Sequence, residues 1–380
     1  MSFSYSRIKE QRTDHSIKLF GPDHPFRHIT IVKDFIQKEF KQYENLVKYN
    51  TSVELIAKRA TKWVVTLREF NRDKDNQDYW YQDSYDAVIV ANGHYSIPNI
   101  PNLLGLCEAQ KVNRGLIQHT NSFRNIDDYI NKRILVVGTG ISSIDLVSDI
   151  LPVVKSPLFV SSRGEKPRND FNDSFKINEN LKIKPEITRI DVSENKEKLI
   201  VYFEDGTSLE EIDKLILATG YVYDYPFFKD NEIIVNSNNR VENLFQHIFK
   251  IGDPTLSFVG IVIASITFRI FEYQSTLIAR VLADRSNLPS LEKQKQWELE
   301  LLCKKGNSPA FHAIPPDYQT YYEDLIRLAG KGNGIGHQLQ PFEESWLEIL
   351  DRAKKLKLKY WSRNNVSSHD RLDSNSEATL

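Results

Sequence analysis

The sequence predicts an α/β fold built from two similar domains, one inserted into the other. An apolar strand, a glycine turn and an apolar-periodic helix follow one another between Lys132 and Leu151. In addition, a small β-meander that ends in Ala-X-Gly-aromatic occurs twice, closing at Ala91–His94 and at Ala218–Tyr221. This alternation of buried strands, glycine turns and helices is typical of dinucleotide-binding, Rossmann-like domains.

The glycine turn is the strongest single signal, because it lies between an apolar strand, Ile134–Val137, and a periodic helix. Gly138 permits the tight turn, and Gly140 lets a pyrophosphate approach the backbone. The helix N-terminus supplies free N–H groups and a positive dipole end. The predicted binding loop consists of Gly138, Thr139, Gly140, Ile141, Ser142 and Ser143. The alternative is a structural turn in an unrelated α/β domain.

The residues after the next strand favour NADPH over NADH. An NAD site places Asp or Glu at the end of the second strand, where it binds the ribose 2′-hydroxyl. Here Leu158–Val160 is followed by Ser161, Ser162 and Arg163. A guanidinium pairs bidentately with phosphate oxygens, so Arg163 suits a 2′-phosphate. Glu165 weakens this assignment, and the alternative is that Arg163 is an ordinary solvated loop charge.

Composition excludes several classes of function. A net charge of −1 gives no bulk attraction to nucleic acid or to an anionic membrane. The two cysteines, Cys107 and Cys303, lie far apart without metal-ligand spacing, which indicates a reducing compartment and no metal site. The longest apolar run, Phe258–Phe268, is too short to span a bilayer and is predicted to be a buried strand or helix. The N-terminus has no apolar signal-peptide segment, so we expect a cytoplasmic protein.

The two halves of the repeat differ in one respect. The first module runs from Val53 to His94 and the second from Leu181 to Tyr221. The second domain carries its glycine loop at Gly138, but the only glycine before Gly93 is Gly21, which has no glycine partner. The sequence therefore predicts that the first domain lacks its N-terminal βα unit and the phosphate-binding loop.

Five motifs, in consistent order and spacing, resemble those of the flavin-containing monooxygenases, closest to the short fungal type of the N- and S-oxygenating branch. They are Gly115–Phe123, with Asn113 in place of the family's first phenylalanine; Val90–Pro98; Gly138–Ser143; Ala218–Tyr221 with the following aromatics; and Gly252–Phe258. The resemblance covers roughly residues 20 to 350, and relative to the family the chain is expected to be N-terminally truncated.

The resemblance implies an FAD- and NADPH-dependent monooxygenase, an oxidoreductase of the N,N-dimethylaniline monooxygenase type. Such a flavoprotein would oxygenate soft nucleophiles (thiols, sulfides or amines) through a flavin hydroperoxide. Its partners would be a small nucleophilic substrate and O₂, with no nucleic acid, and the resemblance allows a homodimer and a peripheral position at the endoplasmic reticulum. The missing first loop leaves two alternatives: an impaired paralogue that binds NADPH without flavin, and a non-enzymatic interaction protein.

The resemblance also implies roles for single residues, each with a plainer alternative. Asn92, with Gly93, would contact flavin or nicotinamide, or would only tolerate a tight turn; no other catalytic residue is assigned. Asp253, expected to follow an apolar strand, would accept a ribityl hydroxyl, or would act as an ordinary cap or turn residue. The remaining implied residues are Thr219 and Gly220 at the cofactor and Gly115, His119 and Phe123 in the family motif, with His119 expected to hydrogen-bond backbone.

We divide the chain into an FAD-domain remnant (1–105), an NADPH-binding domain (106–225), a return to the FAD domain with C-terminal helices (226–360) and a disordered tail (361–380). Helices are predicted at Leu291–Lys304, Tyr318–Ala329 and Glu343–Leu356. In the last of these, apolar side chains recur at helical spacing, at Trp346, Ile349, Leu350 and Ala353.

Overall fold

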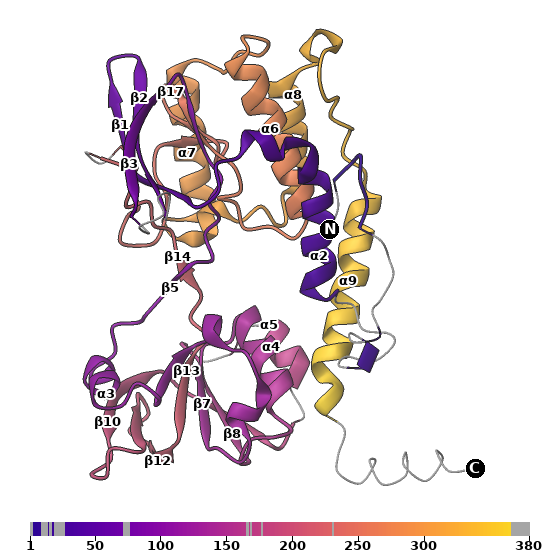
Figure 1. Cartoon of the computed structure of the whole chain (residues 1–380). Coiled ribbons are helices and arrows are strands. Elements are labelled where there is room, and N and C mark those ends of the chain that lie inside the picture. The colour runs from indigo at the N-terminus through magenta and orange to yellow at the C-terminus, as the bar shows by residue number, and fades with distance from the viewer. Residues whose placement is uncertain are drawn as a thin grey trace. The chain divides into compact units, whose positions relative to one another are not determined.

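The computed structural model describes residues 3–8, 14, 17–18, 27–70, 77–164, 167, 169–175, 178–229 and 232–365. Gly21, Glu165 and residues 366–380, which are most of the predicted tail, lie outside the described residues. The chain forms two compact units (Figure 1). The first consists mainly of Phe26–His94 and Tyr223–Leu350, and the second of Tyr95–Val222 together with the chain from Asp351 onward.

The second unit contains a five-stranded parallel sheet in the order β6-β13-β7-β8-β9. Its strands are β6 (Ile117–His119), β7 (Ile134–Val137), β8 (Leu158–Ser161), β9 (Leu181–Lys184) and β13 (Lys214–Leu217). Helix α4 (Ile141–Ile150) connects β7 to β8, and α5 (Asn169–Phe175) lies between β8 and β9. The strand order reverses between β7 and β13, which is the topological switch point where open α/β sheets bind ligands.

Smaller elements complete the second unit. A three-stranded meander precedes β13 and consists of β10 (Ile187–Val192), β11 (Leu199–Phe203) and β12 (Ser208–Ile212). The short strands β5 (Ile97–Pro98) and β14 (Tyr221–Val222) pair antiparallel. The helical pieces are α3 (Leu106–Val112) and the 3₁₀ helices η2 (Thr120–Ser122), η3 (Ile126–Tyr129) and η6 (Ser362–Asn364).

The first unit repeats this plan with a meander ahead of a parallel strand pair, as the sequence predicts. The meander consists of β1 (Thr51–Arg59), β2 (Lys62–Glu69) and β3 (Tyr79–Tyr85). A second sheet has the order β15-β16-β17-β4, with β15 (Leu244–Phe245), β16 (Phe249–Lys250), β17 (Asp253–Phe258) and β4 (Val88–Val90). Trp63 of β2 is fully buried and donates its indole N–H to Thr255 Oγ1 of β17 at 2.9 Å, which joins the two sheets.

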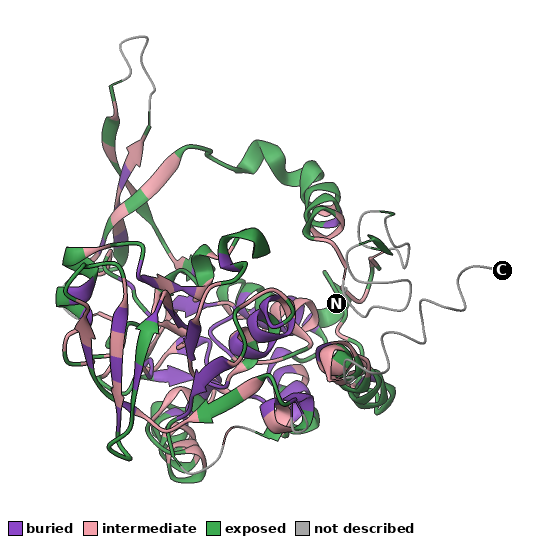
Figure 2. Ribbon diagram, turned by 90° about the horizontal axis from the view of Figure 1, so that it is seen from below, coloured by how far each residue is buried: buried purple, intermediate pink, exposed green. Residues whose placement is uncertain are grey.

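Helices form the rest of the first unit. They are α2 (Ile29–Phe40), α6 (Thr267–Leu282), α7 (Leu291–Lys305) and α8 (Tyr318–Ala329), with η1 (Lys41–Leu46), η4 (Pro309–His312) and η5 (Gly332–Gly334). Helix α9 (Ser345–Trp361) begins in the first unit and continues into the second, which includes the chain from Asp351 onward. Helices α6 and α8 pack together through Tyr273 and Tyr322, whose ring centroids are 4.8 Å apart. Buried residues lie along the strands and the inner helical faces, and exposed ones cover the outer faces (Figure 2). Among the described residues no helix is both long and apolar enough to cross a bilayer.

The structure corrects two sequence-based expectations about apolar segments. The run Phe258–Phe268 is neither one strand nor one helix, because β17 ends at Phe258 and α6 begins at Thr267. A loop joins them, in which Ile261 packs with the strand residues Trp63 and Val90, and Val262 packs with residues of α6 and α8. In α9, Trp346 is buried as the spacing suggests, but Ile349 is 65% exposed.

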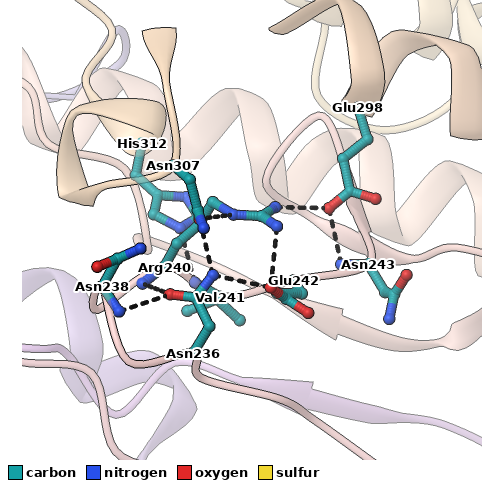
Figure 3. Close-up of polar contacts among 9 residues, drawn as sticks. All are labelled: Asn236, Asn238, Arg240, Val241, Glu242, Asn243, Glu298, Asn307 and His312. Carbon is teal, nitrogen blue, oxygen red and sulfur yellow. Dashed lines mark hydrogen bonds and ion pairs between the residues drawn. The ribbon is translucent and has the colours of Figure 1, made fainter. Parts of the chain in front are cut away.

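A buried polar cluster ties a loop of the first unit to α7 and η4 (Figure 3). The side chain of Arg240 is only 8% exposed and donates to Glu298 at 2.9 Å, to Glu242 at 3.0 Å and to Asn307 at 2.9 Å. Asn236 donates to Glu242 and Asn307, each at 2.7 Å. The guanidinium is therefore paired with two carboxylates in a site with little solvent. Without these carboxylates, the buried charge would destabilise the fold.

Two buried histidines adjoin this cluster, and their hydrogen bonds fix their tautomers. The Val241 backbone N–H donates to His312 Nε2 at 3.0 Å, so this nitrogen carries no proton. His312 Nδ1 lies 3.1 Å from His247 Nδ1 and must then be the donor of that pair. Both imidazoles are neutral in this arrangement. Burial, with the nearby Lys305 charge, lowers the pKa of His247 to about 3. Burial also holds the pKa of His312 well below its ordinary value, assisted by His247, Arg240 and His94.

These shifts predict an acid-sensitive first unit. In the unfolded chain a histidine has a pKa near 6.5. Below that pH, the histidines of the unfolded state bind protons, whereas the buried histidines of the folded state stay neutral. Stability is therefore unaffected above about pH 6.5 and falls at lower pH, by up to about 1.4 kcal/mol per pH unit for each histidine. For His247 this fall continues down to its folded pKa of about 3. Urea unfolding measured between pH 7 and 5 checks this, and His247→Gln should flatten the profile. An unchanged slope in the variant would contradict the assignment.

Candidate dinucleotide-binding site

The predicted glycine loop lies at the switch point of the five-stranded sheet. Gly138 follows β7, has a φ of +105°, and donates its N–H to Ser161 O at 2.9 Å. A Cβ at this position would lie 2.7 Å from the carbonyl oxygen of Ala218, at the end of β13. Both the backbone conformation and the close approach of β13 therefore require glycine here.

Helix α4 begins directly after the loop, with Gly140 as its N-cap. The N–H groups of Ser143 and Ile144 donate to Gly140 O, each at 3.0 Å, which leaves the N–H groups of Ile141 and Ser142 without intrahelical acceptors at the positive end of the helix dipole. A Cβ at Gly140 would meet nothing within 4 Å, so the space beside this backbone is open for a ligand. Ser143 is fully buried in α4, and among the described residues its hydroxyl has no hydrogen-bond partner. Its small side chain lets α4 pack against the sheet. These features fit a dinucleotide pyrophosphate.

The turn after β13 is held next to the loop by two residues. His119, at the end of β6, accepts a hydrogen bond at Nδ1 from Asn121 N at 3.2 Å, so its Nε2 is the protonated nitrogen. Nε2 donates to Gly220 O at 3.0 Å. Asn99 donates its backbone N–H to Gly220 O at 2.9 Å and its side-chain amide to Thr219 O at 3.2 Å. His119 thus contacts backbone, as the sequence predicts, and it orients the Thr219–Gly220 turn.

The end of β8 presents one candidate for a 2′-phosphate. Arg163 is exposed two residues beyond this strand, at the same sheet edge as Gly138. The neighbouring hydroxyls are directed elsewhere: Ser161 donates to Pro185 O at 2.8 Å, and both Ser161 and Ser162 are 3% exposed. The expected combination of two hydroxyls and an arginine is therefore reduced to the guanidinium of Arg163.

In the first unit, Asn92 and Gly93 follow β4, and Gly93 has a φ of +74°. The adjacent parallel strand, β17, ends in a second glycine turn at Gly260, with a φ of +88°. His94 lies between these turns. Burial lowers its pKa, partly offset by a hydrogen bond with the Gly260 backbone, and its ring packs on Tyr223 at 5.0 Å. Gly260 is a candidate site residue that was not predicted, although the sequence shows an apolar strand followed by glycine at Leu256–Gly260.

Asp253 follows the short strand β16, as the sequence predicts, but it is also the first residue of β17. The parallel register of β17 with β4 puts it at the edge opposite Asn92. Its carboxylate forms an ion pair with Lys58 and accepts from Thr255 Oγ1 at 2.5 Å. Burial alone would raise the pKa of Asp253, but these two partners lower it below its ordinary value. Ile251 and Gly252 form the hairpin turn that joins β16 to β17, and Asp253 pairs with Lys250 across this turn.

The remaining motif residues lie around β6. Gly115 precedes the strand and donates its N–H to Asn113 Oδ1 at 2.9 Å, so the asparagine that replaces the family's phenylalanine supports this turn. Phe123 follows η2 and stacks on Tyr129 with ring centroids 5.7 Å apart. Gly115 lies before β6, whereas Phe123 follows its carboxyl end and packs against the hydrophobic cluster that includes Ile144 of α4.

Comparison with known proteins places the chain among flavoproteins. Residues 168–337 match the family described as flavin-binding monooxygenase-like, and residues 32–247 match the pyridine nucleotide-disulphide oxidoreductases. The flavin-containing monooxygenase ustF2 of Aspergillus flavus is 26% identical over 88% of this chain and 72% of its own length. The flavin-containing monooxygenase FMO GS-OX-like 7 of Arabidopsis thaliana is 30% identical over 87% of this chain and 68% of its own length. The chain spans 53% and 63% of two further relatives.

A solved structure shares the fold. The S-allyl-L-cysteine S-oxygenase of Allium sativum matches the whole chain and 81% of its own length, with a TM-score of 0.73 and 22% identity. The α/β architecture with Rossmann-like domains is therefore that of known monooxygenases, as the sequence predicts.

Proposed function

Because the chain belongs to the flavin-containing monooxygenases, enzymes that use FAD and NADPH, we propose that it oxygenates soft nucleophiles such as thiols, sulfides and amines. The observation that carries this proposal is the strand–glycine turn–helix at the switch point of the second unit. When bound, NADPH supplies a hydride and the flavin activates oxygen, so the protein needs no nucleophile or metal of its own for the bond chemistry.

The residues of the second unit have distinct parts in this proposal. Gly138 and Gly140 leave room for the pyrophosphate, and the first turn of α4 donates backbone N–H groups to it. Arg163 pairs with the 2′-phosphate. His119, through its Nε2 proton, keeps the Thr219–Gly220 turn in place beside the loop. This site orients the bound NADPH and excludes water from it, and it transfers no proton.

In the first unit, we propose that the glycine turns at Gly93 and Gly260 face the flavin, with Asn92 beside its ring. Support comes from the position of both turns at the carboxyl ends of the parallel strands β4 and β17, the edge at which α/β sheets bind nucleotides. A second candidate function is NADPH binding without tight flavin binding. It is favoured because the glycine turns at Gly93 and Gly260, unlike Gly140, do not lead directly into a helix.

One experiment separates the two functions. The purified protein is mixed with FAD and NADPH, and oxygen consumption is followed with a thioether and with a tertiary amine. Substrate-dependent NADPH oxidation with formation of the sulfoxide or N-oxide supports the monooxygenase. NADPH binding in a colourless protein that consumes no oxygen supports the second candidate.

Replacing Arg163 by alanine tests the cofactor assignment. A charge-assisted pair with phosphate contributes about 1.5–3 kcal/mol, so NADPH affinity should fall about ten- to hundredfold. NADH affinity should hardly change, because NADH has no 2′-phosphate. Titration calorimetry with both nucleotides gives the comparison. Arg114→Ala is the matched control, because Arg114 is also exposed but precedes β6 at the opposite edge of the sheet. Equal weakening of both nucleotides by Arg163→Ala would refute the assignment.

A further inference from the structure

A short segment near the C-terminus packs on α4, the helix whose N-terminus carries the glycine loop (Figure 1). We name residues 360–365, the end of α9 with η6 and Asn365, the C-terminal clasp. It lies outside both stretches that match known families, residues 32–247 and 168–337. The first five residues of the predicted tail, 361–365, are thus part of this ordered segment.

The first contact of the clasp is made by Trp361. Its side chain is 3% exposed and belongs to the same hydrophobic cluster as Ile144 and Val147 of α4. Its indole N–H donates to Asp145 Oδ1 at 2.7 Å. An apolar ring and a directed hydrogen bond therefore fix the clasp on the middle of α4, although more than 200 residues separate them in sequence.

The second contact caps the C-terminal end of α4. Arg363 donates to the Ser148 carbonyl at 3.0 Å and to Asp149 Oδ1 at 2.8 Å, and it also bonds the Ser148 hydroxyl. Asn364 donates to the same Ser148 carbonyl at 2.6 Å. Carbonyls in the last turn of a helix lack intrahelical partners, and a cation there complements the negative end of the dipole. The clasp supplies both a donor and a positive charge.

A third set of contacts fastens the clasp itself to the rest of the second unit. Asn365 donates to Ser174 O of α5 at 2.7 Å. Asn178 donates its side-chain amide to Asn364 O at 2.9 Å and to Asn365 Oδ1 at 3.1 Å. The clasp is therefore held against α5 as well as α4, and it can fix the position of one helix relative to the other.

We propose that the C-terminal clasp positions α4 for cofactor binding, with Trp361 and Arg363 as positioning residues of the dinucleotide site. The inference rests on the proposed NADPH binding of the second unit. The clasp caps one end of α4, and the pyrophosphate binds at the other end, about 15 Å away for a ten-residue helix. The clasp and the bound pyrophosphate both stabilise α4 in the same position. By thermodynamic linkage, an intact clasp therefore strengthens pyrophosphate binding, and bound pyrophosphate strengthens the contacts of the clasp.

The test combines two readouts on the full chain. In Arg363→Met, hydrogen exchange of the amides of α4 should become about tenfold faster without cofactor, and the NADPH dissociation constant should rise about five- to tenfold. NADH affinity should fall by the same factor, because the clasp acts on the pyrophosphate end shared by both nucleotides. Arg363→Lys should restore part of the affinity. In the wild type, NADPH should in turn slow exchange in residues 360–365.

A milder variant and a control complete the design. Trp361→Phe keeps an aromatic ring but removes the N–H donor to Asp145, so it should weaken NADPH less than Arg363→Met while leaving the protein folded. Lys359→Ala changes an exposed residue of the same helix and should leave both readouts unchanged.

The outcomes distinguish the clasp from the proposed function. If the wild type does not bind NADPH, the proposed function fails, and the clasp proposal fails with it. If the wild type binds NADPH and Arg363→Met binds it equally well, only the clasp proposal is overturned, even when exchange in α4 becomes faster. In that case the clasp is a structural contact alone.

Discussion

Gly138→Ala should abolish measurable NADPH binding and destabilise the second unit. At this position a side chain must adopt a φ of +105°, and its Cβ would come within 2.7 Å of Ala218 O. Strained backbone and overpacking together cost roughly 2–5 kcal/mol. The loop must shift away from β13 to relieve the contact, and its N–H groups then no longer converge on the pyrophosphate. A loss of only about 2.7 kcal/mol in binding already weakens affinity about a hundredfold.

Gly140→Ala is the matched comparison for Gly138→Ala. The φ of Gly140 is −80°, and a Cβ would meet nothing within 4 Å, so folding should be unaffected. The added methyl group would instead occupy the space left for the pyrophosphate and weaken NADPH about tenfold or more. Nucleotide titration gives the affinities of both variants, and hydrogen exchange of the amides in the five-stranded sheet follows the unfolding of the second unit. Undiminished NADPH affinity in both variants would exclude this loop as the binding site.

Arg240→Met should produce the largest loss of stability in the first unit, about 3–5 kcal/mol. The substitution keeps a similar length of side chain but removes the cation between Glu242 and Glu298 (Figure 3). These carboxylates keep hydrogen bonds from Asn236 and from Asn243 N, yet they would face each other without a compensating charge. Removing one partner from a buried ionic cluster is costly because the remaining charges stay desolvated. Such a loss shifts the folding equilibrium by more than about a hundredfold.

Arg327→Met provides the control for Arg240→Met. Arg327 also pairs with a carboxylate, Asp324, at 2.6 Å, but its side chain is 69% exposed. Exposed ion pairs contribute about 0–1 kcal/mol, so this variant should unfold close to the wild type. Urea unfolding followed by tryptophan fluorescence reports mainly on the first unit, which holds four of the five tryptophans. Similar losses of stability in both variants would show that burial does not determine how much the Arg240 ion pairs contribute to the free energy of unfolding.

The parts that sequence predicted best depend on local patterns. The strand Ile134–Val137, the turn at Gly138 and the helix after Gly140 are as expected, because apolar periodicity and glycine conformation are properties of adjacent residues. Helix α8 has the predicted bounds, Tyr318–Ala329, for the same reason. The two meanders also follow from alternating side chains and turn residues.

Predictions were less accurate where the structure depends on contacts between residues that are distant in sequence. Asp253 was placed at a strand end because an apolar run preceded it, but strand pairing makes it the first residue of β17. The run Phe258–Phe268 is mostly apolar, yet pairing with β4 ends at Phe258 and a loop leads from there to α6, which begins at Thr267. Hydrophobicity predicts burial in each case, but it does not predict which backbone N–H and C=O groups form hydrogen bonds with another strand. Those hydrogen bonds determine whether a buried segment is a strand or a loop.

By itself, the sequence determined the family, the α/β class and the position of the glycine loop, because these depend on residue types at short spacing. Only the tertiary structure decided which groups meet that loop. It brings His119, Asn99 and Ala218 to the edge where Gly138 lies. It also caps α4 with a segment more than 200 residues further along the chain. Such contacts carry no local signal, since each arises when strands pair and helices pack, and each is stabilised by burial and hydrogen bonds that exist only in the folded chain.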